Sequence, residues 1–141
     1  MQVAGDPQAL DIGIGGNKQI EDLPSPRADC VAALDGWTGA IVTTEAVLTE
    51  SLYLLGPRWR AQQVCLEFLK RRAFQLVPST HAVLERVSVL MEKYQDVPMD
   101  YADATLVALG EELETNVVFT LDRRGFSAYR LNGRKTFRII P

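Results

Sequence analysis

Short apolar runs alternate with longer amphipathic stretches from residue 40 to the end of the chain. The short runs predict strands at 40–43, 74–77 and 117–121. Apolar residues spaced three and four apart predict helices at 44–55, 57–72, 80–94 and 100–113. Strands that alternate with helices build parallel sheets covered on both faces. We therefore expect an α/β fold in three layers, with helices flanking a central, mostly parallel sheet.

Two of the predicted helices carry a continuous apolar stripe, which we expect to face the core. The stripe of the helix at 57–72 consists of Ala61, Val64, Cys65, Phe68 and Leu69. That of the helix at 80–94 consists of Leu84, Val87, Met91 and Tyr94. Its place on a stripe predicts a buried thiol for Cys65. Trp59 is expected in the core or in a dimer contact.

The two ends of the chain differ in how clearly they can be interpreted. Asn132-Gly133 separates two apolar-polar segments, 128–131 and 136–140, and predicts a hairpin. A helix is expected at 27–34. Glycine and proline crowd the first 26 residues, where 9–12 is the best candidate for a strand, so this segment is atypical of the rest.

The composition excludes several classes of protein. A chain of 141 residues with 47% hydrophobic residues fits one domain spanning 1–141. It has no apolar run of the roughly 20 residues that cross a bilayer, and no basic and apolar leader, so we expect a cytoplasmic protein without a membrane partner. Two cysteines and one histidine exclude a disulfide framework and a multi-histidine metal centre.

The net charge of −3 is unevenly distributed. Residues 1–50 carry eight acids and two bases, whereas 121–141 carry one acid and six bases. A basic segment on an acidic body suits contact with a polyanion at one place. An ordinary solvated hairpin explains the same charges equally well.

Four acidic residues are candidates for shared chemistry at the carboxyl edge of the sheet, where ligands bind in open α/β folds. They are Asp11, Glu50, Asp103 and Asp122. Carboxylates that converge without bases raise one another's pKa, and a divalent cation removes that cost. An all-oxygen set selects Mg²⁺ or Mn²⁺, which activate water and stabilise a phosphoryl group in metal nucleases. Each acid also has a purely structural explanation, as a helix cap or a surface residue.

Three segments together resemble the PIN-domain family, especially the VapC-type toxins of bacterial toxin–antitoxin pairs. They are Ile41-Val42-Thr43-Thr44-Glu45-Ala46-Val47-Leu48-Thr49-Glu50, Pro98-Met99-Asp100-Tyr101-Ala102-Asp103-Ala104 and Phe119-Thr120-Leu121-Asp122-Arg123-Arg124-Gly125-Phe126. The resemblance implies a parallel-sheet α/β fold, and it matches Glu50, Asp103 and Asp122 to three of the family's four metal-site acids. The fourth belongs to an apolar strand that ends in Asp-Thr or Asp-Ser. Leu10-Asp11-Ile12-Gly13 is the best match and lacks the hydroxyl residue.

By resemblance, we expect an Mg²⁺- or Mn²⁺-dependent endoribonuclease that acts on RNA, forms a homodimer and is silenced by a small antitoxin protein. Arg123 and Arg124 follow Asp122 and are candidates to hold RNA phosphates, although both could simply face solvent. The divergent N-terminus leaves a second hypothesis, a PIN-fold binding or regulatory module with an impaired metal site. A third is a phosphatase on another α/β fold, with Asp122 as the nucleophile.

Overall fold

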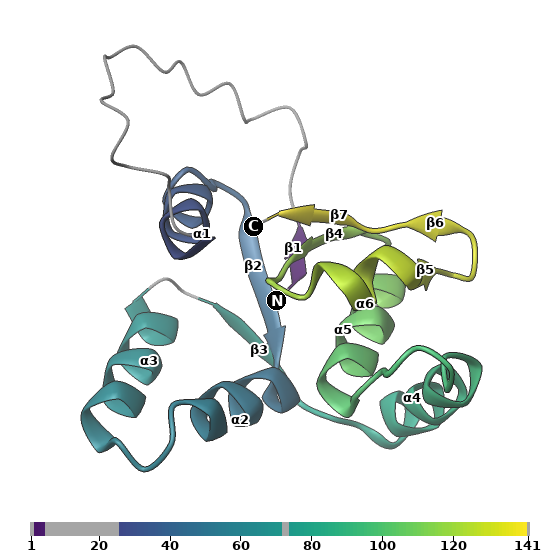
Figure 1. Cartoon of the computed structure of the whole chain (residues 1–141), viewed down its shortest axis with the longest axis horizontal. Coiled ribbons are helices and arrows are strands. Elements are labelled where there is room, and N and C mark those ends of the chain that lie inside the picture. Colours follow the sequence, from purple (N-terminus) through teal and green to yellow (C-terminus); the bar gives the residue numbers. More distant parts are fainter. Residues whose placement is uncertain (1, 5–25, 72–73, 141) are drawn as a thin grey trace.

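The computed structural model describes residues 2–4, 26–71 and 74–140. Six helices and seven strands are found in these ranges (Figure 1). The helices are α1 (Pro26–Asp35), α2 (Glu45–Leu54), α3 (Trp59–Arg71), α4 (His81–Lys93), α5 (Tyr101–Glu112) and α6 (Arg123–Ala128). The strands are β1 (Gln2–Ala4), β2 (Ala40–Thr44), β3 (Gln75–Val77), β4 (Val117–Phe119), β5 (Arg130–Leu131), β6 (Lys135–Thr136) and β7 (Arg138–Ile140).

Five strands form the main sheet in the order β3-β2-β1-β4-β7. The outer pairs β2–β3 and β4–β7 are parallel, as the alternation of strands and helices predicts. The central strand β1 differs, because it runs antiparallel to both β2 and β4. Its last residue, Ala4, lies opposite Ala40 at the beginning of β2. The carboxyl end of β1 is therefore at the opposite edge of the sheet from those of β2 and β4.

Alternate residues of the strands face opposite layers, because side chains in a strand point to the two faces of the sheet in turn. Val118 is fully buried in the large core that includes α4, α5 and α6. Its neighbour Val117 packs with Ala33 and Trp37 at the other face, where α1 lies. The expected three-layer arrangement is thus confirmed, with α1 on one face of β4 and β7 and α4, α5 and α6 on the other.

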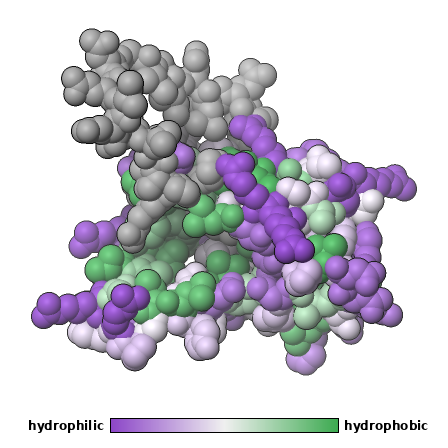
Figure 2. Space-filling model, viewed as in Figure 1, coloured by the Kyte–Doolittle hydropathy of each residue, from purple (hydrophilic) through white to green (hydrophobic). Residues whose placement is uncertain are grey.

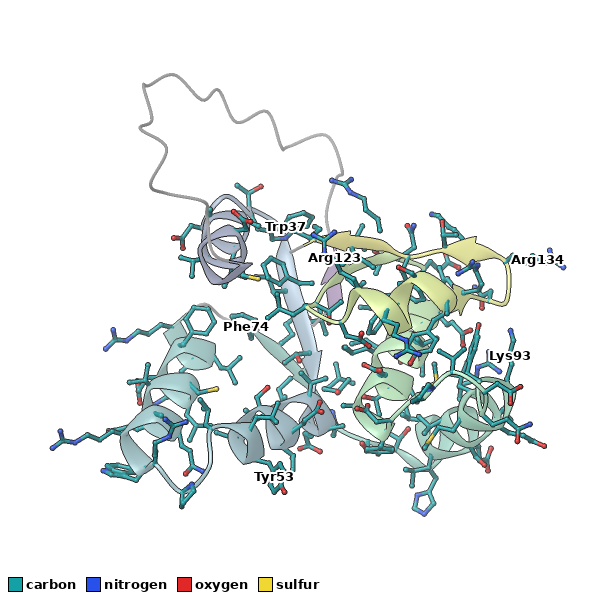
Figure 3. All side chains as sticks on the ribbon, in the orientation of Figure 1. Trp37, Tyr53, Phe74, Lys93, Arg123 and Arg134 are labelled. Atoms are coloured by element: carbon teal, nitrogen blue, oxygen red, sulfur yellow. The ribbon has the colours of Figure 1, made fainter. Side chains whose placement is uncertain are left out.

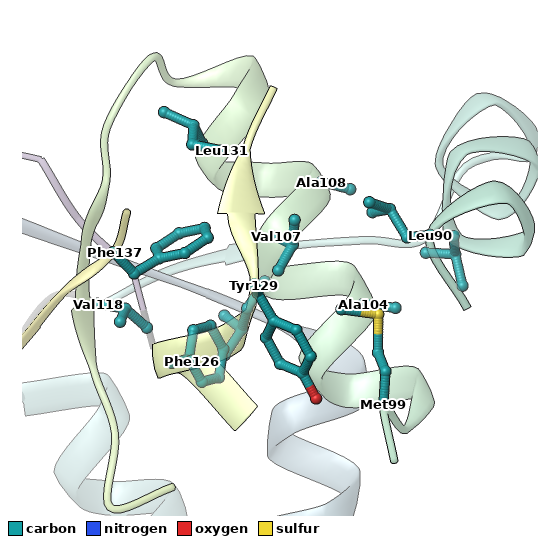
Figure 4. Close-up of a cluster of buried hydrophobic side chains, with 12 residues drawn as sticks. Leu90, Met99, Ala104, Val107, Ala108, Val118, Phe126, Tyr129, Leu131 and Phe137 are labelled. Carbon is teal, nitrogen blue, oxygen red and sulfur yellow. The ribbon is translucent and has the colours of Figure 1, made fainter. Parts of the chain in front are cut away.

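The main core is built around α5, which is buried on nearly all sides (Figure 4). Two aromatic side chains, Phe126 and Tyr129, are fully buried beside it with their ring centroids 5.3 Å apart. Phe126 also packs edge-to-face on Phe137, at 5.4 Å between ring centroids. At the far end of α5, Glu111 pairs with Arg86 of α4 through two hydrogen bonds of 2.6 and 2.8 Å. Aromatic stacking and the ion pair hold α4, α6 and the C-terminal strands on α5.

The stripe predicted for the helix at 57–72 is wrong in one respect. The helix α3 begins at Trp59, and none of its residues is buried. Val64 is 69% exposed, and Cys65 is only partly covered. An apolar stripe shows which face of a helix can be buried, but only a neighbouring element can bury it. Among the described residues, that neighbour is lacking for most of α3.

Smaller corrections concern α4 and the C-terminal hairpin. In α4, Val87 and Leu90 are the buried residues, while Leu84 and Met91 of the predicted stripe remain exposed. The hairpin does form around Asn132-Gly133, where both residues have positive φ, but its strands β5 and β6 contain two residues each. Residues 138–140 leave it and join the main sheet beside β4.

The strand predicted at 9–12 lies outside the described residues. No helix in the described ranges is long and apolar enough to cross a membrane.

Candidate functional site

The N-terminus of α5 carries two of the acidic residues at the candidate site. Asp100 is the helix N-cap, and its Oδ1 accepts a hydrogen bond from the backbone N–H of Asp103 at 2.8 Å. This is the ordinary role of aspartate at an N-cap, as one interpretation of the sequence proposed. Asp103 itself is in the first helical turn and is half-buried. The cap thus fixes the first turn from which the Asp103 carboxylate projects.

Asp122 lies at the start of the helix that follows β4, as Asp100 and Asp103 lie at the start of α5. It is the N-cap of α6, where its Oδ1 accepts hydrogen bonds from the backbone N–H groups of Arg124 at 3.1 Å and Gly125 at 3.2 Å. Gly125 is buried beneath this carboxylate. A Cβ at Gly125 would collide with Asp122 Oδ2 and would lie 2.8 Å from the hydroxyl of Tyr129. The lack of a side chain at Gly125 therefore lets the Asp122 carboxylate and the Tyr129 hydroxyl both lie close to this position.

Tyr129 links this point to Asp103, and sequence reasoning missed it. Its ring is fully buried, with Tyr94 and Phe126 packed against it at centroid distances of 5.1 and 5.3 Å. Its hydroxyl is 3.2 Å from Asp103 Oδ2 and 3.1 Å from the carbonyl oxygen of Pro98, and can donate to either. Nothing in the sequence distinguishes this residue, because it falls within the apolar segment predicted as a strand.

A pair of buried threonines joins β2 and α2 to α5. Thr44 ends β2 and caps α2, accepting a hydrogen bond from the backbone N–H of Val47 at 3.3 Å. The hydroxyl of Thr105 donates to the carbonyl oxygen of Ala102 at 2.7 Å, so in the 2.9 Å contact between the two hydroxyls Thr44 is the donor. This contact ties the start of the helix that carries Glu50 to the start of the helix that carries Asp103.

The carboxylates of the site lie close enough for their like charges to repel one another. Burial and the neighbouring Asp100 carboxylate raise the pKa of Glu50. The pKa of Asp103 rises to about 6, because of its burial and the charges of Asp100, Asp122 and Glu50, although the hydrogen bond from Tyr129 acts against the rise. The structure thus brings Glu50, Asp103 and Asp122 into one electrostatic cluster, with Asp100 as a fourth member. We call these four residues the acidic cluster.

The remaining predicted residues are not members of the acidic cluster. Burial and the Asp29 carboxylate raise the pKa of the Cys30 thiol, while the guanidinium of Arg123 lowers it. Arg123 is therefore on the α1 side of the molecule, where Figure 3 also shows Trp37. Arg124 is exposed and contacts Asp122 through its backbone N–H. Asp11 lies outside the described residues.

The acidic cluster offers the oxygen ligands that a hard divalent cation prefers, but its side chains do not form a complete coordination site. In the described ranges, no three histidine, cysteine, aspartate or glutamate side chains converge closely enough to hold one ion. All donors in the cluster are carboxylate oxygens, which suit Mg²⁺ or Mn²⁺ better than zinc. The raised pKa of Asp103 reflects like-charge repulsion that a cation would relieve. The residues present therefore fit such a cation by their chemistry.

Two comparisons with known proteins bear on this site. Residues 20–131 match the PIN domain family. The chain is also 34% identical over 110 residues to a protein of Mycobacterium tuberculosis (strain ATCC 25618 / H37Rv) named Ribonuclease VapC26. The aligned region covers 77% of this chain and 82% of that protein. The family match includes Glu50, Asp103 and Asp122 and begins after Asp11.

Proposed function

This chain belongs to the VapC-type branch of the PIN-domain family, and on that premise we propose that it is an Mg²⁺- or Mn²⁺-dependent endoribonuclease. The observation that supports this most directly is the acidic cluster, in which the half-buried Asp103 carboxylate is exposed to the negative charges of both Glu50 and Asp122. The relative's printed name, a ribonuclease, supports RNA as the substrate class.

Glu50, Asp103 and Asp122 are the residues that would hold the cation. When bound, a divalent cation of this kind acidifies water and stabilises the charge that develops on a phosphoryl group. The chain prepares these residues in two ways. Tyr129 donates to Asp103 from a rigid, buried ring, and two backbone N–H groups of α6 hold Asp122 Oδ1. Both carboxylates are thus oriented before any ligand arrives.

The basic residues after Asp122 would bind the RNA backbone. We assign this role to the exposed Arg124, since its backbone already contacts Asp122. Arg123 lies toward Cys30 of α1 and would contact a more distant phosphate. Arginine forks match phosphate oxygens in pairs, so both residues would position the strand rather than read its sequence.

We further propose that the chain acts as a single cytoplasmic domain, as the toxin of a toxin–antitoxin pair and as a homodimer. The apolar surface of α3, which no described element covers, supports a protein partner, because Val64 of the stripe is 69% exposed and Trp59 at the start of the helix is 66% exposed. Hydrophobic side chains also gather over the α2–α3 part of the face in Figure 2. A basic side chain of an antitoxin would complement the acidic cluster and block it.

A second candidate function is a binding or regulatory module with an impaired metal site. The course of β1 favours it, because this antiparallel strand has its carboxyl end at the edge opposite the acidic cluster. The family match also starts at residue 20, beyond Asp11. A site that lacks its fourth acid would bind the cation weakly and would turn over slowly.

Cleavage of mixed structured RNAs with Mg²⁺ or Mn²⁺ tests the proposed activity against an EDTA control. Asp103→Asn should reduce the rate at least about a hundredfold, because several kcal/mol of transition-state stabilisation depend on the cation. Glu67→Gln, a substitution of an acid on α3, should leave the rate unchanged. Cleavage that survives in Asp103→Asn would reject the proposed site. A folded protein that cuts no RNA and binds Mn²⁺ weakly by calorimetry would favour the regulatory module.

A further inference from the structure

A cavity of about 520 Å³ adjoins the acidic cluster, between α2 and the start of α5. Glu50 and Asp100 belong both to its lining and to the cluster. Its volume is in the range of sites for small molecules, roughly 300–1,000 Å³. A nucleotide whose phosphate lies at the acidic cluster would have a base within reach of this cavity.

Two tyrosines line the cavity, one on each side. Tyr53 belongs to α2, where it shares one helix face with Glu45 and Thr49, because the three residues are four positions apart. From the other side comes Tyr101, whose hydroxyl is hydrogen-bonded to Ser79 Oγ at 2.8 Å. Tyr53 is 82% exposed and projects from α2 in Figure 3, and Tyr101 is 38% exposed. Their position at a cavity makes both rings available for stacking.

The charge of the cavity selects the kind of group that it accepts. The described residues that line it include three carboxylates, of Glu45, Glu50 and Asp100, and no lysine or arginine. A phosphate is repelled there, whereas a neutral ring with N–H donors is attracted. Asp100 is engaged as the cap of α5, and Glu50 belongs to the proposed cation site. The carboxylate of Glu45 has no hydrogen-bond or ion-pair partner in the described part of the chain, so both of its oxygens can accept hydrogen bonds from a ligand.

We infer that this cavity binds an unpaired guanine base of the RNA beside the bond that is cut, with Tyr53 as the stacking platform and Glu45 as the acceptor. This inference rests on the proposed ribonuclease function. Guanine presents two adjacent N–H donors on its Watson–Crick edge, and these match the two oxygens of one carboxylate. Single-stranded RNA is recognised in this way in general, by stacking on aromatic rings and by hydrogen bonds to exposed base edges.

Binding of free nucleosides tests the cavity without any cleavage. Guanosine has no phosphate and requires no metal, so its titration into the ¹⁵N-labelled full chain measures the base site alone. We expect guanosine to shift the backbone amide signals of Thr49, Tyr53 and Ala102 more than adenosine, cytidine or uridine does. Tyr53→Ala should weaken the guanosine affinity about tenfold or more, as loss of a stacking ring does. Glu45→Gln should remove the preference for guanosine.

Trp59→Ala is the matched control, because this ring is also largely exposed, at 66%, and lines a separate hollow of about 510 Å³ beside α3. It should leave guanosine binding unchanged. Signals that shift around Trp59, or not at all, would overturn the inference. So would a Tyr53→Ala variant that binds guanosine normally and loses its homodimer, because the surface would then be a protein interface.

Cleavage of uridine oligonucleotides that contain one guanine separates this inference from the proposed function. Cutting next to the guanine, with the preference lost in Tyr53→Ala and Glu45→Gln, supports both. Cutting without base preference retains the ribonuclease and rejects the guanine site. If guanosine binds but no RNA is cut under any metal condition, the proposed function fails, and the inferred role in cleavage fails with it.

Discussion

The helices α3 and α5 are almost equal in length but have opposite surroundings. In α5, eight of twelve residues are buried, including glycine, alanine and threonine. In α3, none of thirteen residues is buried, although its apolar residues form the clearer stripe. The hydrophobic pattern of a helix thus indicates which of its faces can be buried, but not how far the helix is buried in the core. Depth depends on how many elements surround the helix, and only α5 has neighbours on several sides.

This difference also locates the candidate site. The acidic residues at the start of α5 stand on the best-packed element of the molecule, and their neighbours Tyr129 and Gly125 are buried. A site on rigid elements holds its side chains in fixed directions. The α3 stripe, by contrast, is not covered by any element in the described part of the chain. The two helices therefore suggest a division between a rigid site and an accessible interaction surface, and four predictions test that division.

Leucine-to-alanine substitutions in the two helices should give the largest contrast. Leu106 of α5 is 4% exposed, so Leu106→Ala should reduce the free energy of unfolding by about 2–5 kcal/mol. Leu66 of α3 is 41% exposed, and Leu66→Ala should change it by about 0.5 kcal/mol or less. Urea denaturation of both variants measures the contrast. An equally large loss at Leu66 would mean that a partner or a second copy covers α3 in solution.

Gly125→Ala should reduce both stability and activity. The added methyl group would collide with the Asp122 carboxylate and press on the Tyr129 hydroxyl, both of which belong to the rigid region. Overpacking of this kind costs about 1–3 kcal/mol. Gly56→Ala provides the contrasting case, since Gly56 has a positive φ of 63° and nothing within 4 Å, so that its cost comes from backbone strain alone and its activity should be normal. A Gly125→Ala variant with normal activity would show that Asp122 and Tyr129 need not approach each other.

Tyr129→Phe should cost about 1–2 kcal/mol, the usual effect of losing one buried hydrogen bond. Because the hydroxyl of Tyr129 lowers the pKa of Asp103, its removal should raise that pKa further above about 6. The acidic limb of the cleavage rate against pH should then move to higher pH. Tyr94→Phe is a suitable control, as the Tyr94 hydroxyl accepts from the backbone of Arg130 instead. An identical pH profile in both variants would remove Tyr129 from the site.

Asp103→Asn should change stability in the opposite direction to Leu106→Ala, Gly125→Ala and Tyr129→Phe. The pKa of Asp103 is raised from 3.8 to about 6 in the folded state, so the folded wild type binds its proton more tightly than the unfolded chain. Its stability therefore declines as the pH rises from about 4 to about 6. Without metal, Asp103→Asn should melt higher than the wild type at pH 7.5 but not at pH 4. Glu67→Gln on α3, where Lys70 lowers the pKa of an exposed carboxylate, should show no such gain.

Much of the local structure could be predicted from the sequence because its causes are local. The caps at Thr80 and Asp100 and the turn at Asn132-Gly133 depend on residues a few positions away. The same holds for the order of strands and helices from residue 40 to residue 121, whereas the short helix α6 was not expected. The three acids that the family resemblance matched could also be located on their elements, because Asp103 and Asp122 lie at the starts of helices and Glu50 lies within α2.

Only the tertiary structure decided which surfaces meet. It left the α3 stripe uncovered, reversed the central strand β1 and placed Tyr129 and Gly125 beside Asp103 and Asp122. Each of these facts depends on residues far apart in the chain, and no local propensity encodes them. The sequence by itself determined where helices, turns and acidic residues occur. The packing of distant elements determined the burial of these residues, the pKa values of their side chains and their contacts, because those properties arise only when the elements come together.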